Sequence, residues 1–195
     1  MLMTVSLVYL VGKAQTSHAQ TPHVEFGLKA GLNVAGLHSS ATDNLDSRAS
    51  AYAGVLAHIH LSKHIAVQPE VLYSGQGAKQ DIGDGSYALR LNYINVPVLF
   101  QYMFGDGFRL QTGPQLGILT NAKAKSGNTT TGVKSNFTSA DFAWSVGAGY
   151  LTHSGVGVDA RYNIGINNIN NTGDYNRNKL QNRVFQVGLF YQFIH

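Results

Sequence analysis

The chain has 195 residues, which fits a single domain. Only 12% of them are charged, half of the roughly 25% that is usual in soluble proteins. The formal net charge of +4 is small and the basic residues are scattered, which argues against a nucleic-acid partner. Cysteine is absent, which excludes disulfides, thiolate metal sites and a cysteine nucleophile.

The N-terminal residues 1–12 form an apolar run, which is followed by the small-x-small sequence Ser17-His18-Ala19. This pattern predicts a secretory signal peptide over residues 1–19 and a β-barrel domain over residues 20–195. The run is too short to cross a bilayer as a helix, which needs about 20 apolar residues. A first core strand is the alternative interpretation.

Apolar and polar residues alternate with a period of two along most of the chain, which predicts β-strands. The predicted strands span residues 24–38, 51–62, 64–78, 87–104, 108–120, 138–151, 156–167 and 182–193. Long polar loops are expected at 39–50, 79–86, 121–137 and 168–181, and short turns at 62–63, 105–107 and 152–155. Long loops at one end and tight turns at the other are typical of outer-membrane barrels.

The hairpin over residues 87–120 shows the two faces of the predicted sheet. One face carries apolar and aromatic residues such as Phe100 and Phe108, and the other carries polar residues such as Arg109 and Gln115. We expect the apolar face to contact lipid and the polar face to fill the lumen. An eight-stranded barrel is just wide enough for side chains to fill it, so no open pore is expected.

The predicted fold is therefore all-β: a closed eight-stranded antiparallel up-and-down transmembrane β-barrel. An even number of strands closes such a sheet without a free edge, as the bilayer requires. Pro97 and Pro114 cannot donate to a sheet ladder, so we expect a bulge or an unpaired carbonyl opposite each. A secreted soluble β-barrel that binds a small ligand is an alternative.

A polar network is predicted in the lumen, with charges of both signs that should be paired because an unpaired buried charge is costly. Its expected members are Glu25, Lys29, His58, His60, Gln68, Glu70, Arg109, Gln115, Asp159 and Arg161. Asp159 and Arg161 lie two residues apart on one face, so cross-strand pairing with Arg109 and Glu70 is expected. A proton or solute path along these residues is the alternative.

Two histidine patterns have catalytic or metal-binding alternatives. His58 and His60 share a strand face and can in principle ligate a metal, but hydrogen bonding in the lumen is the favoured role. His153 and Ser154 have the residue types of a hydrolase, but no carboxylate stands beside them to complete a triad. We therefore expect no enzyme activity, no metal and no cofactor; a barrel enzyme acting on lipid or peptide is the alternative.

Five stretches of the chain form a distinctive set: Phe26-Gly27-Leu28-Lys29-Ala30-Gly31-Leu32-Asn33, Gln68-Pro69-Glu70-Val71-Leu72-Tyr73-Ser74, Tyr93-Ile94-Asn95-Val96-Pro97-Val98-Leu99, Gly113-Pro114-Gln115-Leu116-Gly117 and Asp159-Ala160-Arg161-Tyr162-Asn163. With them, the chain resembles the PorT-like outer-membrane β-barrel family of Gram-negative envelopes. The resemblance covers nearly all of residues 20–195 and implies the barrel fold and an outer-membrane location. The ending Gly188-Leu189-Phe190-Tyr191-Gln192-Phe193 resembles the terminal signal recognised by the barrel-assembly machinery, although Ile194 and His195 follow it.

The expected function is that of an integral outer-membrane barrel with a structural, adhesive or partner-binding role through four long extracellular loops. Expected partners are outer-membrane lipid, lipopolysaccharide, the barrel-assembly machinery and an unidentified protein. Lys123, Lys125 and Lys134 lie in the predicted loop at 121–137, where they can contact lipopolysaccharide phosphates. A solvated loop without such contacts is the alternative.

Overall fold

The computed structural model describes residues 23–39, 46–82, 85–105, 107–127, 129–169 and 180–193. Its elements are β1 (Val24–Ser39), β2 (Asp46–His60), β3 (Ile65–Ile82), β4 (Gly85–Phe104), β5 (Phe108–Ser126), β6 (Thr129–Gly132), the 3-10 helix η1 (Lys134–Asn136), β7 (Ala140–Leu151), β8 (Val156–Gly165) and β9 (Leu180–Gln192). Within these ranges, no helix has the length and apolar content needed to cross a membrane. The predicted signal peptide over residues 1–19 lies outside the described residues.

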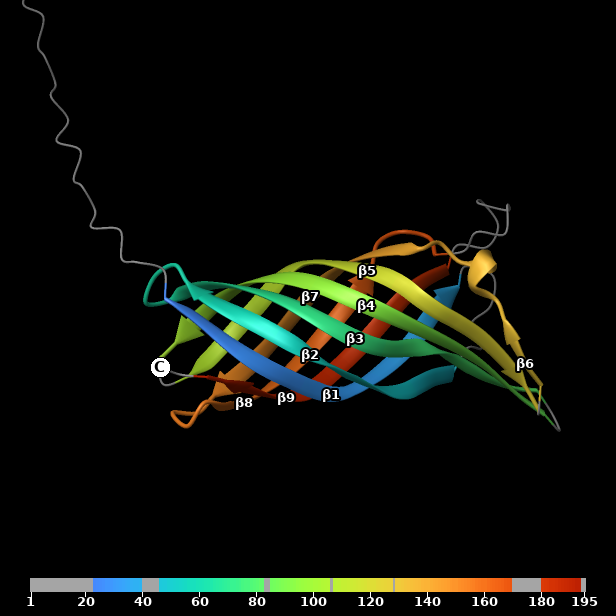
Figure 1. The fold of residues 1–195 in the computed structure, drawn as a ribbon, viewed down its shortest axis with the longest axis horizontal. Helices are drawn as coiled ribbons and strands as arrows, with labels where there is room; N and C mark the ends of the chain where they lie inside the picture. The colour runs from blue at the N-terminus through green and yellow to red at the C-terminus, as the bar shows by residue number, and fades with distance from the viewer. Residues whose placement is uncertain are drawn as a thin grey trace, which may run out of the picture.

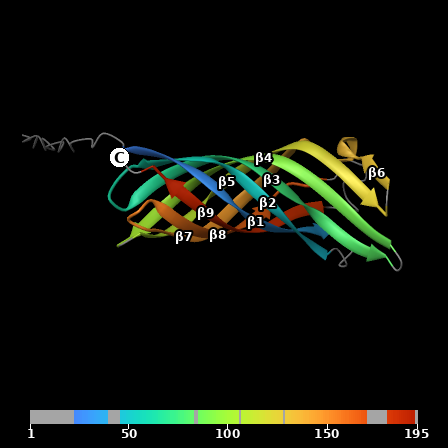
Figure 2. The ribbon, with the colours of Figure 1, turned by 60° about the horizontal axis from the view of Figure 1, so that its bottom comes forward.

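Eight strands close into an antiparallel barrel (Figures 1 and 2). They are paired in the order β4-β3-β2-β1-β9-β8-β7-β5, and the pairing of β4 with β5 completes the ring. The seam between the first and last strands is continuous from Gly27–Gln192 to Ser39–Leu180. The predicted closed eight-stranded barrel is confirmed. The short strand β6 pairs with the far end of β5.

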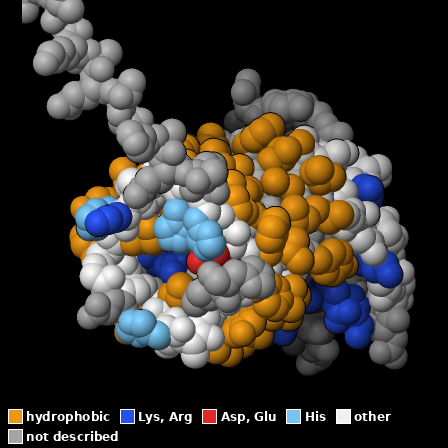
Figure 3. All heavy atoms as spheres, turned by 60° about the vertical axis from the view of Figure 1, so that its left-hand side comes forward, with side chains coloured by type: hydrophobic (Ala, Val, Ile, Leu, Met, Phe, Trp, Pro, Cys, Tyr) orange, Lys and Arg blue, Asp and Glu red, His pale blue; other side chains and the backbone are white. Residues whose placement is uncertain are grey.

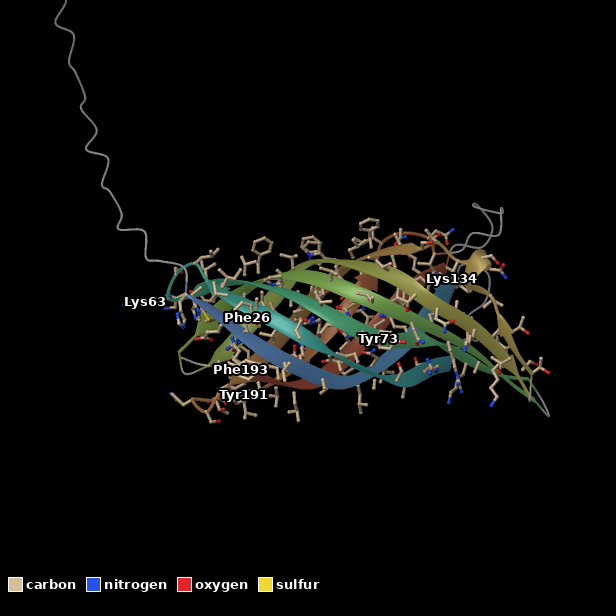
Figure 4. The ribbon with its side chains drawn as sticks, in the orientation of Figure 1. Phe26, Lys63, Tyr73, Lys134, Tyr191 and Phe193 are labelled. Atoms are coloured by element: carbon tan, nitrogen blue, oxygen red, sulfur yellow. The ribbon has the colours of Figure 1, made fainter. Side chains whose placement is uncertain are left out.

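The outer surface of the barrel is apolar over most of its height, and Figure 3 shows these side chains as a broad orange band. β8 illustrates the alternation: its large outward apolar side chains are 41–48% exposed, whereas Arg161 and Asn163 on its inner face are 2% exposed. Phe26, Tyr191 and Phe193 project outward near the end that carries the short turns (Figure 4). An apolar outside with aromatic residues near its rim is the pattern of a lipid-facing barrel, not of a soluble one.

Three of the four predicted long loops are wrong over much of their length. β2 begins at Asp46, β3 continues to Ile82, and β5 continues to Ser126, so that only residues 83–84 separate β3 from β4. Figure 1 shows β3, β4, β5 and β6 extending beyond the other strands at the end opposite the short turns. We call residues 75–82, 85–93, 119–126 and 129–132 the sheet extension. Its outer residues are polar because they lie beyond the apolar band, and in the sequence they resemble a loop.

Inside the sheet extension the pattern of apolar residues is reversed. An apolar cluster, which we call the apolar cap, fills the lumen there; its members are Ala78, Leu89, Leu91, Tyr93, Leu119, Ala122 and Ile169, with Tyr87, Val133, Phe137 and Leu180 packed against it. Above the apolar band the outer face meets water, so apolar side chains gain by turning inward. The prediction of a polar inner face throughout is wrong at this end of the barrel.

A β-bulge at Thr120 accompanies this reversal on β5. The β4–β5 register changes by one residue between Asn92 and Tyr93, which leaves Thr120 as the extra residue. The Thr120 hydroxyl donates a hydrogen bond to the Asn92 carbonyl at 2.8 Å. Because an extra residue shifts the alternation by one, Ala122 points inward and Lys123 points outward.

A bulge, one of the two outcomes expected opposite Pro97 and Pro114, is not formed at either proline. The β3–β4 register is the same before and after Pro97, and the β4–β5 register is the same on either side of Pro114. Instead, the described ladders contain no residue of β3 paired with Pro97 and no residue of β4 paired with Pro114. The strands therefore tolerate the missing N–H groups by a local gap in pairing.

The outward orientation of the apolar face can be tested with Trp144, the only tryptophan of the chain. Its ring is 44% exposed within the apolar band, and its indole N–H donates to the Thr112 hydroxyl at 2.9 Å. When the protein is folded into vesicles of brominated phosphatidylcholine, we expect strong quenching of tryptophan emission relative to unbrominated vesicles. Emission that is unaffected by the bromines would contradict the lipid-facing assignment.

Candidate functional site

Four charged side chains meet at mid-height in the lumen and form what we call the ion quartet. Arg161 of β8 donates through Nη1 to Glu70 Oε2 and through Nη2 to Glu70 Oε1, both at 2.9 Å. Arg161 Nη2 also lies 3.1 Å from Asp159 Oδ2. Lys29 Nζ contacts Asp159 Oδ2 and lies 3.4 Å from Glu70 Oε1. β1, β3 and β8 thus deliver two cations and two carboxylates to one point.

The ion quartet is dry and electrically balanced. None of its four side chains is more than 5% exposed. Removing charges from water costs several kcal/mol per ion, and that cost is offset only where the geometry is good and the remaining hydrogen bonds are made. The two-pronged Arg161–Glu70 contact has this geometry. Each carboxylate contacts both cations, so the quartet is a closed electrostatic unit.

Neutral polar side chains extend the ion quartet toward the short-turn end. Gln68 Nε2 donates to Glu70 Oε1 at 2.8 Å, and Gln68 Oε1 lies 3.1 Å from His58 Nδ1. Gln111 Nε2 donates to Asp159 Oδ2 at 3.1 Å. Gln68 and Gln111 therefore donate to the same carboxylate oxygens that the cations contact.

Arg109 lies apart from the ion quartet, nearer the short turns. It donates through Nη1 to Gln101 Oε1 at 3.4 Å and to Gln192 Oε1 at 3.3 Å, and its guanidinium sits 5.5 Å from the centroid of the Phe190 ring. Among the described contacts, Arg109 therefore does not form the ion pair that was expected with Asp159 of β8. Gln192 Nε2 in turn donates to Glu25 Oε2 at 3.2 Å, so Arg109 and Glu25 are joined through a glutamine.

The remaining predicted site residues, His58, His60 and Gln115, lie outside the ion quartet. The rings of His58 and His60 are 4.5 Å apart in an edge-to-face arrangement. In the part of the chain that the structure describes, no group of three or more His, Cys, Asp or Glu side chains is placed to hold a metal ion. Gln115 is buried and its Oε1 has no hydrogen-bond partner there. The Ser154 hydroxyl hydrogen-bonds to Thr152 at 2.8 Å.

A second buried acid, Asp141 of β7, lies between the ion quartet and the apolar cap. Asn182 Nδ2 donates to its Oδ2 at 3.3 Å, while Oδ1 has no hydrogen-bond partner among the described residues. No described Lys, Arg or His forms an ion pair with it. The nearby Asn95 and Tyr93 each also leave a buried polar atom unpaired. Asp141 was not among the expected site residues, although its position next to the outward Phe142 places it on the inner face.

A basic face covers the outside of the sheet extension. Its cations, Lys79 of β3, Arg90 of β4, and Lys123 and Lys125 of β5, are exposed or partly exposed. The prediction that Lys123 and Lys125 belong to a loop is wrong, because both lie in β5, and Lys134 begins η1. Strand pairing therefore fixes the spacing of the cations on this face.

Breaking the ion quartet should destabilise the barrel strongly. We expect Glu70→Gln to lower the free energy of unfolding by about 3 to 5 kcal/mol, because it leaves two buried cations with one carboxylate. Urea titrations of the protein in lipid vesicles, followed by tryptophan fluorescence, measure this. Lys63→Gln in an exposed turn is the control, and an equally small effect of both variants would contradict the assigned role of the quartet.

Asp141→Asn should have the opposite effect. The substitution keeps the size of the side chain and removes an unpaired buried charge, so we expect the free energy of unfolding to rise by about 1 to 3 kcal/mol. Asp159→Asn, made in the same way within the ion quartet, should lower it. The same urea titrations decide the sign, and a destabilised Asp141→Asn variant would show that the carboxylate has a partner.

Comparisons with known proteins agree with this geometry. Residues 14–171 match the family model described as "outer membrane protein beta-barrel domain". No curated protein matches the sequence.

Among solved structures, the chain is similar to Ail, the attachment invasion locus protein of Yersinia pestis, determined in complex with the heparin analogue sucrose octasulfate (TM-score 0.52, 12% identity, 87% of this chain and 99% of that chain). It is also similar to Neisserial surface protein A (TM-score 0.54, 14% identity, 86% and 97%). At such identities the solved structures show the fold alone, but the family model covers most of the sequence, and the chain therefore belongs to the outer-membrane β-barrel domain family.

Proposed function

We propose that this outer-membrane barrel conducts no solute and acts by binding partners on its sheet extension. In barrels of this kind the short turns face the periplasm and the longer connections face outside. The sheet extension lies opposite the short turns, so it projects from the cell surface (Figure 1). The PorT-like assignment, the signal peptide over residues 1–19 and recognition of residues 188–193 by the barrel-assembly machinery belong to the same proposal.

The observation that carries this proposal is the closure of the lumen at two separate levels. The ion quartet occupies the middle of the barrel with side chains at most 5% exposed. Nearer the sheet extension, Leu91, Tyr93 and Ile169 of the apolar cap are fully buried. A polar solute would have to disrupt a balanced charge cluster and then cross an apolar layer, and both steps are costly.

Rigidity of the sheet extension supports a binding role. Ile169 is held in the apolar cap by two backbone hydrogen bonds, from its own N–H to the Leu180 carbonyl and from the Thr138 N–H to its carbonyl, both at 3.0 Å. The Val133 N–H donates to the Ala122 carbonyl at 3.0 Å. A surface that is already ordered loses less conformational entropy on binding.

A binding role is also better supported than catalysis. The charged groups of the ion quartet are hydrogen-bonded to one another, which leaves none of them available as an acid, base or nucleophile. The structure of Ail, which has a similar fold, holds a sulfated sugar analogue of heparin. By analogy, we propose that an anionic ligand binds the present chain as well, on the side that faces outside.

Recordings in planar bilayers test the closed lumen. We expect no stable conductance steps from the purified full chain in concentrated potassium chloride, because the ion quartet and the apolar cap lie in series. A porin inserted in the same bilayer supplies the positive control for insertion and detection. Reproducible ohmic steps, together with swelling of sugar-loaded liposomes, would overturn the proposal and favour a solute path along the lumen residues.

A further inference from the structure

We propose that the basic face of the sheet extension binds the phosphate groups of lipopolysaccharide in the outer leaflet. This inference rests on the proposed function, because it requires the sheet extension to lie outside the cell. It goes further by naming the ligand chemistry and the residues that recognise it.

Strand register gathers the four cations into a compact cluster. Arg90 of β4 lies directly opposite Lys123 of β5. In the neighbouring row, Ala88 of β4 has Lys125 on one side and Lys79 on the other. Residues that are paired across an antiparallel sheet share a face, with Cβ atoms about 4.5 to 5.5 Å apart. The four positive charges are therefore held side by side on one surface.

The directly opposed pair Arg90 and Lys123 is unfavourable unless an anion binds to it, whereas Lys79 lies opposite Asp46 of β2 in the strand register. Like charges that are directly opposite on neighbouring strands destabilise a sheet. The carboxylates whose side chains the structure describes, Glu25, Glu70, Asp141 and Asp159, are buried in the lumen. None of the ion pairs among described residues includes a member of the basic face.

The height of the basic face matches the phosphate layer of a membrane. Ile94 of β4 and Ile118 of β5 are still exposed as part of the apolar band. Arg90 lies four residues beyond Ile94, which is about 13 Å along a strand and, with a tilt of roughly 45°, about 9 Å in height. The headgroup layer is roughly 5 to 7 Å thick on each side of the hydrocarbon. The long side chains of Arg90 and Lys123 therefore reach the headgroup phosphates.

Position and chemistry favour a lipid over a soluble polyanion. The cations lie on the flank of the sheet, directly above the apolar band, and in the view of Figure 3 blue side chains lie just beyond the orange band. A guanidinium beside an ammonium suits phosphate, which accepts two parallel hydrogen bonds from arginine. A phosphorylated lipid anchored in the apolar band would present its phosphate at this height.

The test compares two variants that each remove two positive charges. In Arg90→Gln/Lys123→Gln the paired cations of the basic face are lost. In the control Lys63→Gln/Lys134→Gln the charges are removed from the two opposite ends of the molecule (Figure 4). The full chain is folded into detergent micelles, heat-modifiable gel migration shows that each variant is folded, and native mass spectrometry measures the binding of bisphosphorylated lipid A.

We expect Arg90→Gln/Lys123→Gln to weaken lipid A binding at least tenfold and the control to bind like the wild type. Lipid A from which both phosphates have been removed should bind the wild type as weakly as bisphosphorylated lipid A binds the variant. Equal binding by both variants, or no effect of the phosphates, would overturn the inference. Loss of binding to heparin in the variant, with lipid A binding unchanged, would also overturn it and assign the face to a soluble polyanion. The proposed function is tested separately by the bilayer recordings, in which reproducible conductance steps would overturn it.

Discussion

Every long strand of this barrel passes from one solvent into another while its backbone pairing continues. In the apolar band the outer face meets hydrocarbon, so side chains such as Leu28 and Val158 point outward and polar ones point inward. Beyond the band the outer face meets water, and apolar side chains such as Leu91 turn inward. The hydrogen-bonded sheet continues across this boundary, but the face that carries the apolar side chains changes from the outer to the inner one. The apolar cap, the basic face and the bulge at Thr120 all follow from this reversal.

Within the hydrocarbon region the lumen is the only place for polar side chains, and its contents must be mutually satisfied. The ion quartet meets this requirement with two cations and two carboxylates, all dry, so the interior carries no net charge at that height. Asp141 is an exception, because its single amide partner leaves one carboxylate oxygen unpaired among the described residues. The barrel therefore combines one charge-balanced polar layer with one that holds an unpaired carboxylate, and the apolar cap separates both from the outside.

Alternation in the sequence was enough to predict the closed barrel and to place Phe100 outside and Arg109 inside, because a period of two assigns a face to every residue. It did not predict partners, since those depend on register: Glu70 meets Arg161, whereas Arg109 meets two glutamines. The sheet extension was missed because its outer residues are polar, like those of a loop. Lys123 is four residues beyond the inward Leu119, so strict alternation would turn it inward as well. It points outward because of the bulge at Thr120, which alternation alone does not predict.

The extra residue at Thr120 also has a consequence for how this sequence can change over evolution. A deletion inside a strand usually moves every residue beyond it to the opposite face. Here, loss of the extra residue would restore unbroken alternation and leave Ala122 facing the apolar cap and Lys123 and Lys125 facing outward. Sequences that share the barrel but lack the bulge can therefore carry the same cations one position earlier in the strand, on the same face. A one-residue gap at this point of an alignment leaves the surface charge unchanged, whereas a gap elsewhere in the strand would reverse it.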